Sequence, residues 1–102
     1  MSARVRFHEA ARDEYLAAAI RYEDARPGLG GDFQMEVDEY VDKAAAGMLP
    51  GSPTTSVQGH DIRKLPLNRF PYVLHFERRG DELIVWAVAH TRRRPGYWRR
   101  RR

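Results

Sequence analysis

The sequence predicts a two-layer α+β domain in which a helical hairpin packs on one face of an antiparallel sheet. Three observations predict this fold. Residues 4–8 alternate in polarity as a short strand does, residues 9–46 carry apolar side chains at helical spacing with one interruption, and residues 60–90 return to a period of two. The order is therefore strand, helix, helix and three strands. The only large apolar surface on which the helices can bury their stripes is one face of the sheet.

The helical region divides at RPGLGG, residues 26–31, where a proline and three glycines predict a turn. The first helix is expected over residues 9–25. Its apolar stripe is widened by Leu16 and Ile20 and otherwise consists of Ala11, Tyr15, Ala18, Ala19 and Tyr22. The second helix is expected to run to about Ala46, with an apolar stripe formed by Phe33, Val37, Tyr40, Val41, Ala44 and Met48. The short connection makes the pair an antiparallel hairpin.

Residues 47–59 are rich in Gly, Pro, Ser and Thr and predict a loop. Strands are expected at residues 60–67, 70–77 and 82–90. In the first of them Ile62 and Leu65 are expected to point inward. In the second, one face carries Tyr72, Leu74 and Phe76 and the other carries Val73 and His75. The third, ELIVWAVAH, is almost entirely apolar, which predicts a central strand buried on both faces. The sheet face opposite the helices is left for solvent or for a partner.

Composition excludes several kinds of site. The 102 residues suffice for one domain and include no cysteine, which excludes disulfides, thiolate metal ligands and cysteine nucleophiles. The four histidines fall on different strands or strand ends, and no glycine loop has phosphate-binding spacing, so no metal and no cofactor are expected. No signal peptide or membrane-spanning run is visible, which predicts a cytoplasmic protein with no membrane partner.

Charge is divided unequally along the chain. Residues 1–91 contain 11 lysines and arginines against 14 acidic residues, a net charge of −3. Residues 92–102 contain seven arginines and no acidic residue, a net charge of +7. We expect residues 1–98 to form the domain and residues 99–102 to be a mobile basic extension, because chain ends fray and a charged end speeds encounter with an anionic partner.

The residues that follow the last predicted strand, HTRRRPGYW at 90–98, are candidates for a site, because a rigid strand end presents them at the surface. His90 can transfer protons near neutral pH. The arginines are permanent cations that bind anions. Tyr97 and Trp98 can either stack on bases or pack back onto the sheet. The candidates for contact with a target or partner are Arg92, Arg93, Arg94, Tyr97 and Trp98.

Over roughly residues 4–98 the sequence resembles the RelE/ParE family of toxins from type II toxin–antitoxin systems. The resemblance rests on Tyr22-Glu23 in an acidic helix, the PGLG turn before Phe33, the spacing from Arg63 to FPY at 70–72, and AVAHTRRRPGYW at 87–98. It implies the fold derived above. It also implies a growth-inhibiting bacterial toxin, of a kind associated with plasmid stabilization, that forms a hetero-oligomer with a cognate antitoxin.

The family divides by target. The resemblance to RelE-like members implies a ribosome-dependent endoribonuclease that cuts mRNA, with Arg63, His90, Arg92 and Tyr97 as candidate catalytic residues. The resemblance to ParE-like members implies an inhibitor of DNA gyrase. The strand at 70–77 has Tyr72 and Val73 where the nucleases place an arginine, which favours the gyrase-directed branch. The endoribonuclease and a nucleic-acid-binding module without toxicity remain as alternatives.

Overall fold

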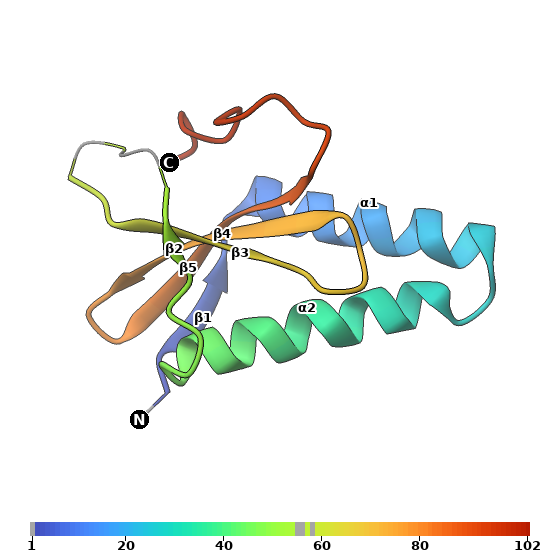
Figure 1. Cartoon of the computed structure of the whole chain (residues 1–102), viewed down its shortest axis with the longest axis horizontal. Coiled ribbons are helices and arrows are strands. Elements are labelled where there is room, and N and C mark those ends of the chain that lie inside the picture. Colours follow the sequence, from blue (N-terminus) through green and yellow to red (C-terminus); the bar gives the residue numbers. More distant parts are fainter. Residues whose placement is uncertain (1, 55–56, 58) are drawn as a thin grey trace.

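The computed structural model describes residues 2–54, 57 and 59–102, which form two layers, a helical hairpin and a five-stranded sheet (Figure 1). The elements are β1 (Arg4–Phe7), α1 (Glu9–Ala25), α2 (Leu29–Ala45), β2 (Ser52–Pro53), β3 (Ile62–Pro66), β4 (Tyr72–Arg79) and β5 (Glu82–His90). The sheet order is β1-β5-β4-β3-β2; β1 runs parallel to β5 and the other pairs are antiparallel. The predicted fold class and order are confirmed. The strand predicted to be central, β5, is an inner strand between β1 and β4, and β4 holds the middle of the sheet. The short β2 lies within the predicted loop, of which residues 55, 56 and 58 are outside the described residues.

The two helices are joined by a tight turn that Glu23 stabilises. Gly28 has a φ of 89°, and the Glu23 carboxylate accepts hydrogen bonds from the backbone N–H groups of Gly28 (2.9 Å) and Gly30 (3.1 Å). A carboxylate at this position satisfies N–H groups that have no partner within the helix and complements the helix dipole. Helix α2 therefore begins at Leu29, and the prediction of a turn over residues 26–31 is wrong for residues 29–31.

The main core lies between the hairpin and the face of the sheet that we call the helix face. Its largest fully buried side chains include Phe33, Val37, Leu74 and Val85. The central residues of the apolar stripes predicted for the two helices are buried in this core. The edges of the predicted stripes are wrong: Leu16 and Ile20 on α1 are exposed, and so is Met48, which lies beyond the end of α2.

The opposite face of the sheet, which we call the outer face, has a smaller core of its own. A bulge in the pairing of β4 with β5 leaves Trp86 without an opposite residue, so Trp86 and Ala87 both lie in this outer cluster. Ile62 is also buried in the outer cluster, whereas Leu65 packs against the main core. The prediction that Ile62 and Leu65 share a face is wrong, because residues an odd number apart on a strand point to opposite faces.

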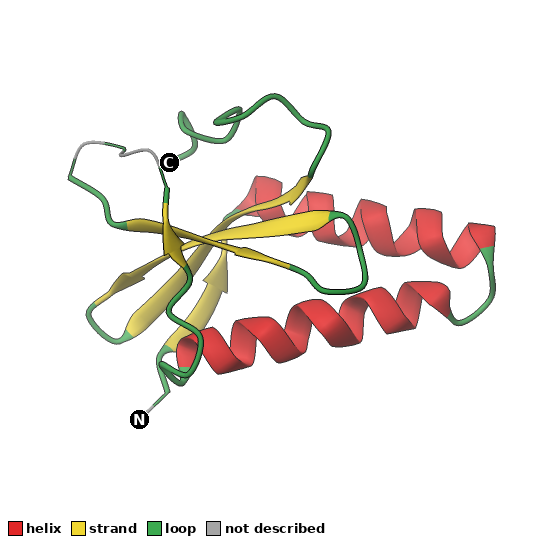
Figure 2. Ribbon diagram, in the orientation of Figure 1, coloured by secondary structure: helices red, strands yellow, loops and turns green. Residues whose placement is uncertain are grey.

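Residues 91–102, which we call the C-terminal segment, cover part of the outer face. Figure 2 shows this segment as a loop that turns back from the end of β5. Trp98 is only 4% exposed, and its ring lies 4.6 Å from that of His75 on β4. The sheet face opposite the helices was expected to be free for solvent or a partner. Part of this face is instead covered by the C-terminal segment. No helix in the described residues is long and apolar enough to span a membrane.

Candidate functional site

Among the described residues, the two larger recesses that border the C-terminal segment contain most of the candidate residues. The first, which we call the cationic pocket, has a volume of about 260 Å³ and lies over the outer face; its charged lining residues are Lys64, Arg93, Arg94 and Arg99. The second, which we call the α1 groove, has a volume of about 420 Å³ and separates α1 from the C-terminal segment; its polar lining residues are Asp13, Glu14, Arg21, Tyr72, His90, Arg93 and Tyr97. Both recesses owe their shape to the way the C-terminal segment is attached.

Glu14 on α1 provides that attachment. Its two carboxylate oxygens accept a bidentate pair of hydrogen bonds from the Arg101 guanidinium, at 2.9 and 2.8 Å, and Oε2 also accepts one from the Tyr97 hydroxyl. The side chains of Glu14 and Arg101 are 15% and 16% exposed, so the ion pair is largely shielded from water. A bidentate, shielded arginine–carboxylate pair is among the stronger polar contacts in proteins. The expectation that residues 99–102 form a mobile extension is therefore wrong at Arg101.

The same pair completes the edge of the sheet. Strand β1 pairs with residues 82–85 of β5, so within the described part of the chain the edge beyond Val85 has no neighbouring strand along residues 86–90. There the Val88 N–H donates to Glu14 Oε1 (3.0 Å), and the Trp86 carbonyl accepts from Arg101 Nη1 (2.9 Å). Side chains thus replace the strand partners that these buried backbone groups require.

The environment shifts the acid–base properties of this cluster. Burial tends to raise the pKa of Glu14, but the hydrogen bonds from Arg101, Tyr97 and the Val88 N–H outweigh burial and hold that pKa below its ordinary value. Burial and the hydrogen bond to Glu14 raise the pKa of Tyr97. The Tyr97 hydroxyl therefore stays protonated and is already committed as a donor, which leaves it poorly suited to act as a base.

His75 forms the floor of the cationic pocket and stays neutral. Burial, followed by the nearby charge of Lys64, lowers its pKa to about 4. Its Nδ1 atom is buried and has no hydrogen-bond partner among the described residues. His75 therefore adds no positive charge to the pocket at neutral pH.

Comparison with known proteins places this geometry in a known fold. The chain is similar to a solved chain described as the chromosomal ParDE TA system from P. aeruginosa, with a TM-score of 0.70, 18% sequence identity, and coverage of 87% of this chain and 96% of that chain. The chain shares the fold of that solved chain. No protein-family model and no curated protein sequence matches the sequence.

Within this fold, the four candidate catalytic residues are not all brought together. Arg63 pairs in register with Phe76, so it points to the helix face, where it forms an ion pair with Asp61 at 3.1 Å. His90 and Tyr97 both line the α1 groove and also the cationic pocket. The His90 Nδ1 atom accepts a hydrogen bond from the backbone N–H of Arg92 at 3.1 Å, and the Arg92 residue itself is exposed. Lys64, the neighbour of Arg63, is the β3 cation that reaches the outer face.

The candidate contact residues divide into two kinds. Arg92, Arg93 and Arg94 are exposed, and the Arg93 guanidinium lies 3.9 Å from the centre of the Tyr97 ring. Trp98 and the hydroxyl of Tyr97 are used internally, so they anchor the C-terminal segment. The second of the two readings that the sequence left open for these aromatics, packing back onto the sheet, is the one observed.

Two polar clusters carry no signal in the sequence. Glu14 looks like any other acid of an acidic helix, and its partner Arg101 lies 87 residues away. Glu77 is 3% exposed on the outer face, where it contacts Trp86 Nε1 (3.0 Å), His60 Nδ1 (2.9 Å) and Arg79 Nε (3.1 Å). A buried carboxylate with this many partners is satisfied and stabilises the outer cluster. The described residues contain no group of three or more His, Cys, Asp or Glu arranged to hold a metal ion.

Proposed function

We propose that the chain is the toxin of a type II toxin–antitoxin module, neutralised by a cognate antitoxin, and that it arrests growth in the cytoplasm by binding DNA gyrase. The observation that carries the proposal is the fold match to a ParDE chain, which extends over 87% of this chain and 96% of the other. Nearly every element of one protein has a counterpart in the other, so the likeness concerns the whole domain and not a shared motif.

The arrangement of the site supports binding over mRNA cleavage. An endoribonuclease of this type needs a base for the 2′-hydroxyl and cations at the scissile phosphate within one site. The Tyr97 hydroxyl donates a hydrogen bond to Glu14, and Arg63 points to the opposite face of the sheet from the cationic pocket. His90 lines both the α1 groove and the cationic pocket, so of the four nuclease candidates only Arg63, on the opposite face, and Arg92, in the lining of neither recess, lie apart from the others.

The antitoxin is proposed to be a protein with an acidic segment that orders on this surface. The exposed arginines of the C-terminal segment give one end of the molecule an excess of positive charge. A partly disordered acidic partner gains affinity and fast association from such a surface. The expected product is a hetero-oligomer of toxin and antitoxin.

Inducible expression in a bacterial host tests the proposal. We expect growth arrest on induction, relief of that arrest by co-expression of the protein encoded beside this chain, and intact transcripts when ribosome-bound mRNA is mapped by primer extension. Codon-phased mRNA breaks that disappear with Tyr97→Phe or His90→Ala would instead establish the endoribonuclease. Normal growth at a verified expression level would contradict both toxin readings.

A further inference from the structure

We propose that the α1 groove binds a short extended peptide segment and holds one carboxylate of that segment with Arg21 and Arg93. This binding activity is separate from the toxin assignment, because it depends on the groove alone and not on the target of the chain. It follows from the open edge of β5, from two arginines without a counter-ion and from the length of the groove.

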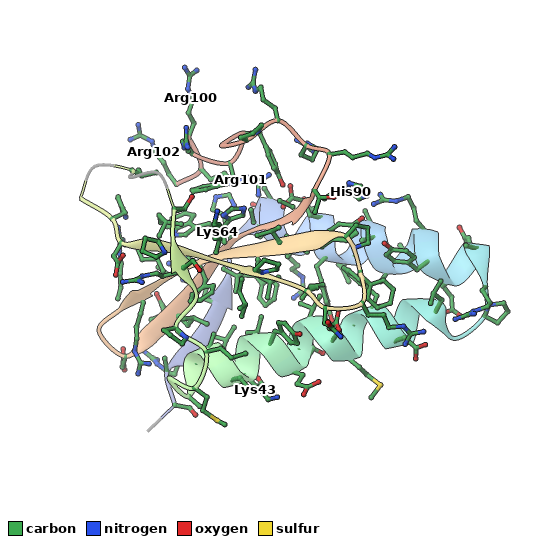
Figure 3. All side chains as sticks on the ribbon, viewed as in Figure 1. Lys43, Lys64, His90, Arg100, Arg101 and Arg102 are labelled. Atoms are coloured by element: carbon green, nitrogen blue, oxygen red, sulfur yellow. The ribbon has the colours of Figure 1, made fainter. Side chains whose placement is uncertain are left out.

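The backbone of β5 offers hydrogen bonds along one wall of the groove. The Val88 N–H faces this edge of the strand, where it donates to Glu14 at 3.0 Å. Backbone polar groups of alternate residues face the same edge, so the Val88 carbonyl and the His90 N–H also face the groove. Both residues line it, and His90 lies between α1 and the C-terminal segment (Figure 3). In the described part of the chain no strand pairs with this edge beyond residue 85, so an extended peptide laid along it would continue the sheet.

Two arginines that line the groove lack a counter-ion. Arg21 on α1 and Arg93 in the C-terminal segment form no ion pair with a carboxylate among the described residues. Glu14, in the same lining, is already paired with Arg101. Guanidinium groups bind carboxylates through charge-assisted hydrogen bonds, which are stronger than those between neutral groups. A carboxylate on the incoming segment would supply the missing counter-ion.

The donors of the groove are held in place before any ligand arrives. Arg21 donates to the Tyr72 hydroxyl at 2.6 Å, and the Arg93 guanidinium lies 3.9 Å from the centre of the Tyr97 ring. The Nδ1 atom of His90 accepts a backbone hydrogen bond, so the neutral ring carries its proton on Nε2 as a further donor. Groups fixed in this way lose less conformational entropy on binding than free surface side chains do.

Asp13 limits the length and the kind of ligand. Asp13 and Arg21 both line the groove and lie eight residues apart on α1, which is about 12 Å along a helix axis. An extended chain rises about 3.3 Å per residue, so three or four residues span this distance. Asp13 would repel the successive phosphates of a nucleic-acid strand, whereas it meets only neutral backbone in a peptide that has one carboxylate at the Arg21 end. The groove therefore favours a peptide over a nucleic acid.

Peptide titration of the isotope-labelled, full-length chain, followed by NMR, tests the proposal. The probe is an acetylated and amidated tetrapeptide of valine, threonine, valine and glutamate, and its counterpart has glutamine in place of glutamate. We expect saturable binding of the glutamate peptide with a shift of the His90 amide signal. The glutamine peptide should bind about tenfold more weakly, because it lacks the charge-assisted hydrogen bond. A glutamine peptide with a free C-terminus shows whether a terminal carboxylate serves as well as a side-chain carboxylate.

Variants on α1 locate the site. Arg21→Gln should weaken binding of the glutamate peptide about tenfold and leave binding of the glutamine peptide unchanged. Arg12→Gln is the matched control, because Arg12 is an exposed arginine of the same helix outside the groove lining, and it should bind as the wild type does. Ala17→Glu is a second variant at an exposed position within the lining, and its added carboxylate should repel the glutamate peptide. All three variants should keep the wild-type circular dichroism spectrum.

Four results would overturn the proposal. They are no saturable binding of the glutamate peptide, equal affinities for the glutamate and glutamine peptides, equal losses in Arg21→Gln and Arg12→Gln, and unchanged binding in Ala17→Glu. An oligothymidylate that shifts the His90 amide signal and loses affinity in Arg21→Gln would show that the groove takes nucleic acid instead. Growth arrest is measured separately, so a chain that arrests growth without binding the peptide contradicts the groove proposal alone.

Discussion

Glu14 joins three parts of the chain that are distant in sequence: helix α1, the open edge of β5 and the C-terminal segment. Its neighbours Glu9 and Asp13 are exposed acids of the same helix, so nothing local marks it as different. The difference arises from position, because only Glu14 faces the edge that β1 leaves unpaired. Two predictions concern this residue and a third concerns His75.

Replacing Glu14 with glutamine should reduce the free energy of unfolding by about 2 kcal/mol, the range for hydrogen bonds to charged groups. The change leaves Arg101 shielded from water without its counter-ion. Urea denaturation at pH 7 measures the effect. Glu39→Gln is the control, since Glu39 is 58% exposed and its pair with Lys43 is worth at most about 1 kcal/mol. Equal losses in the two variants would contradict the anchoring role of Glu14.

The contribution of Glu14 should vanish in acid. Because its pKa in the folded state lies below the ordinary value of 4.5, the ion pair stabilises the fold above pH 4.5, and this stabilisation is lost as pH falls through the folded-state value. The difference in unfolding free energy between wild type and Glu14→Gln, measured from pH 7 down to pH 3, should therefore shrink below about pH 4.5. A difference that stays constant across this range would show that the charge of Glu14 is not responsible.

His75 should cause a second loss of stability in acid, at higher pH than the loss caused by Glu14. The folded state holds His75 neutral down to about pH 4, whereas in the unfolded chain His75 takes up the proton near its ordinary pKa of 6.5. The unfolded state binds more protons between these values, so stability should fall as pH drops from about 6.5 to about 4. The free energy of unfolding of His75→Phe, measured in urea, should depend less on pH over this window than that of the wild type. Identical pH profiles for the two proteins would contradict the buried, neutral state of His75.

At the level of elements, the hairpin depends on close approach of α1 and α2 at one glycine. A Cβ atom on Gly30 would lie 2.4 Å from the Ala19 carbonyl oxygen, whereas a Cβ on Gly31 would meet nothing within 4 Å. Position 30 therefore has no room for a side chain, whereas position 31, next to it in the same helix, does.

This contrast gives a matched pair of substitutions. Gly30→Ala should destabilise the protein by about 1–3 kcal/mol, because the contact is with backbone and the helices must separate. Gly31→Ala should be neutral or stabilising by up to about 1 kcal/mol, because alanine favours helix more than glycine does. Thermal unfolding of the two variants measures both effects. Similar midpoints for the two variants would contradict the close helix contact.

Most elements were predictable because their side-chain periods are strong. The run ELIVWAVAH matches the bounds of β5, and the alternation of Tyr72, Leu74 and Phe76 predicts the helix face of β4. Helix α2 begins earlier than predicted because the side chain of Glu23, near the end of α1, caps it across the turn, and the glycines of the turn conceal this contact in the sequence. The bulge at Trp86 was likewise hidden, since an apolar run gives no sign of a break in alternation.

At the level of the whole molecule, the separation of acidic and basic charge is partly resolved within the chain. Arg101 forms an ion pair with Glu14. Among the described residues, Lys64 and the arginines of the cationic pocket form no ion pair with a carboxylate. The sequence indicated the basic end as the candidate surface, but it could not tell Arg63 from Lys64. That choice depends on the register between β3 and β4, which places Lys64 opposite His75 on the outer face and Arg63 on the helix face.

The central claim is that this chain acts by binding its target and not by cutting RNA. The most direct measurement is a supercoiling assay with purified DNA gyrase and relaxed plasmid, with and without the chain, alongside a translation reaction in which mRNA integrity is followed. The account predicts loss of supercoiling that increases with the amount of chain added, while the mRNA stays intact. Full supercoiling together with fragmentation of ribosome-bound mRNA would contradict it.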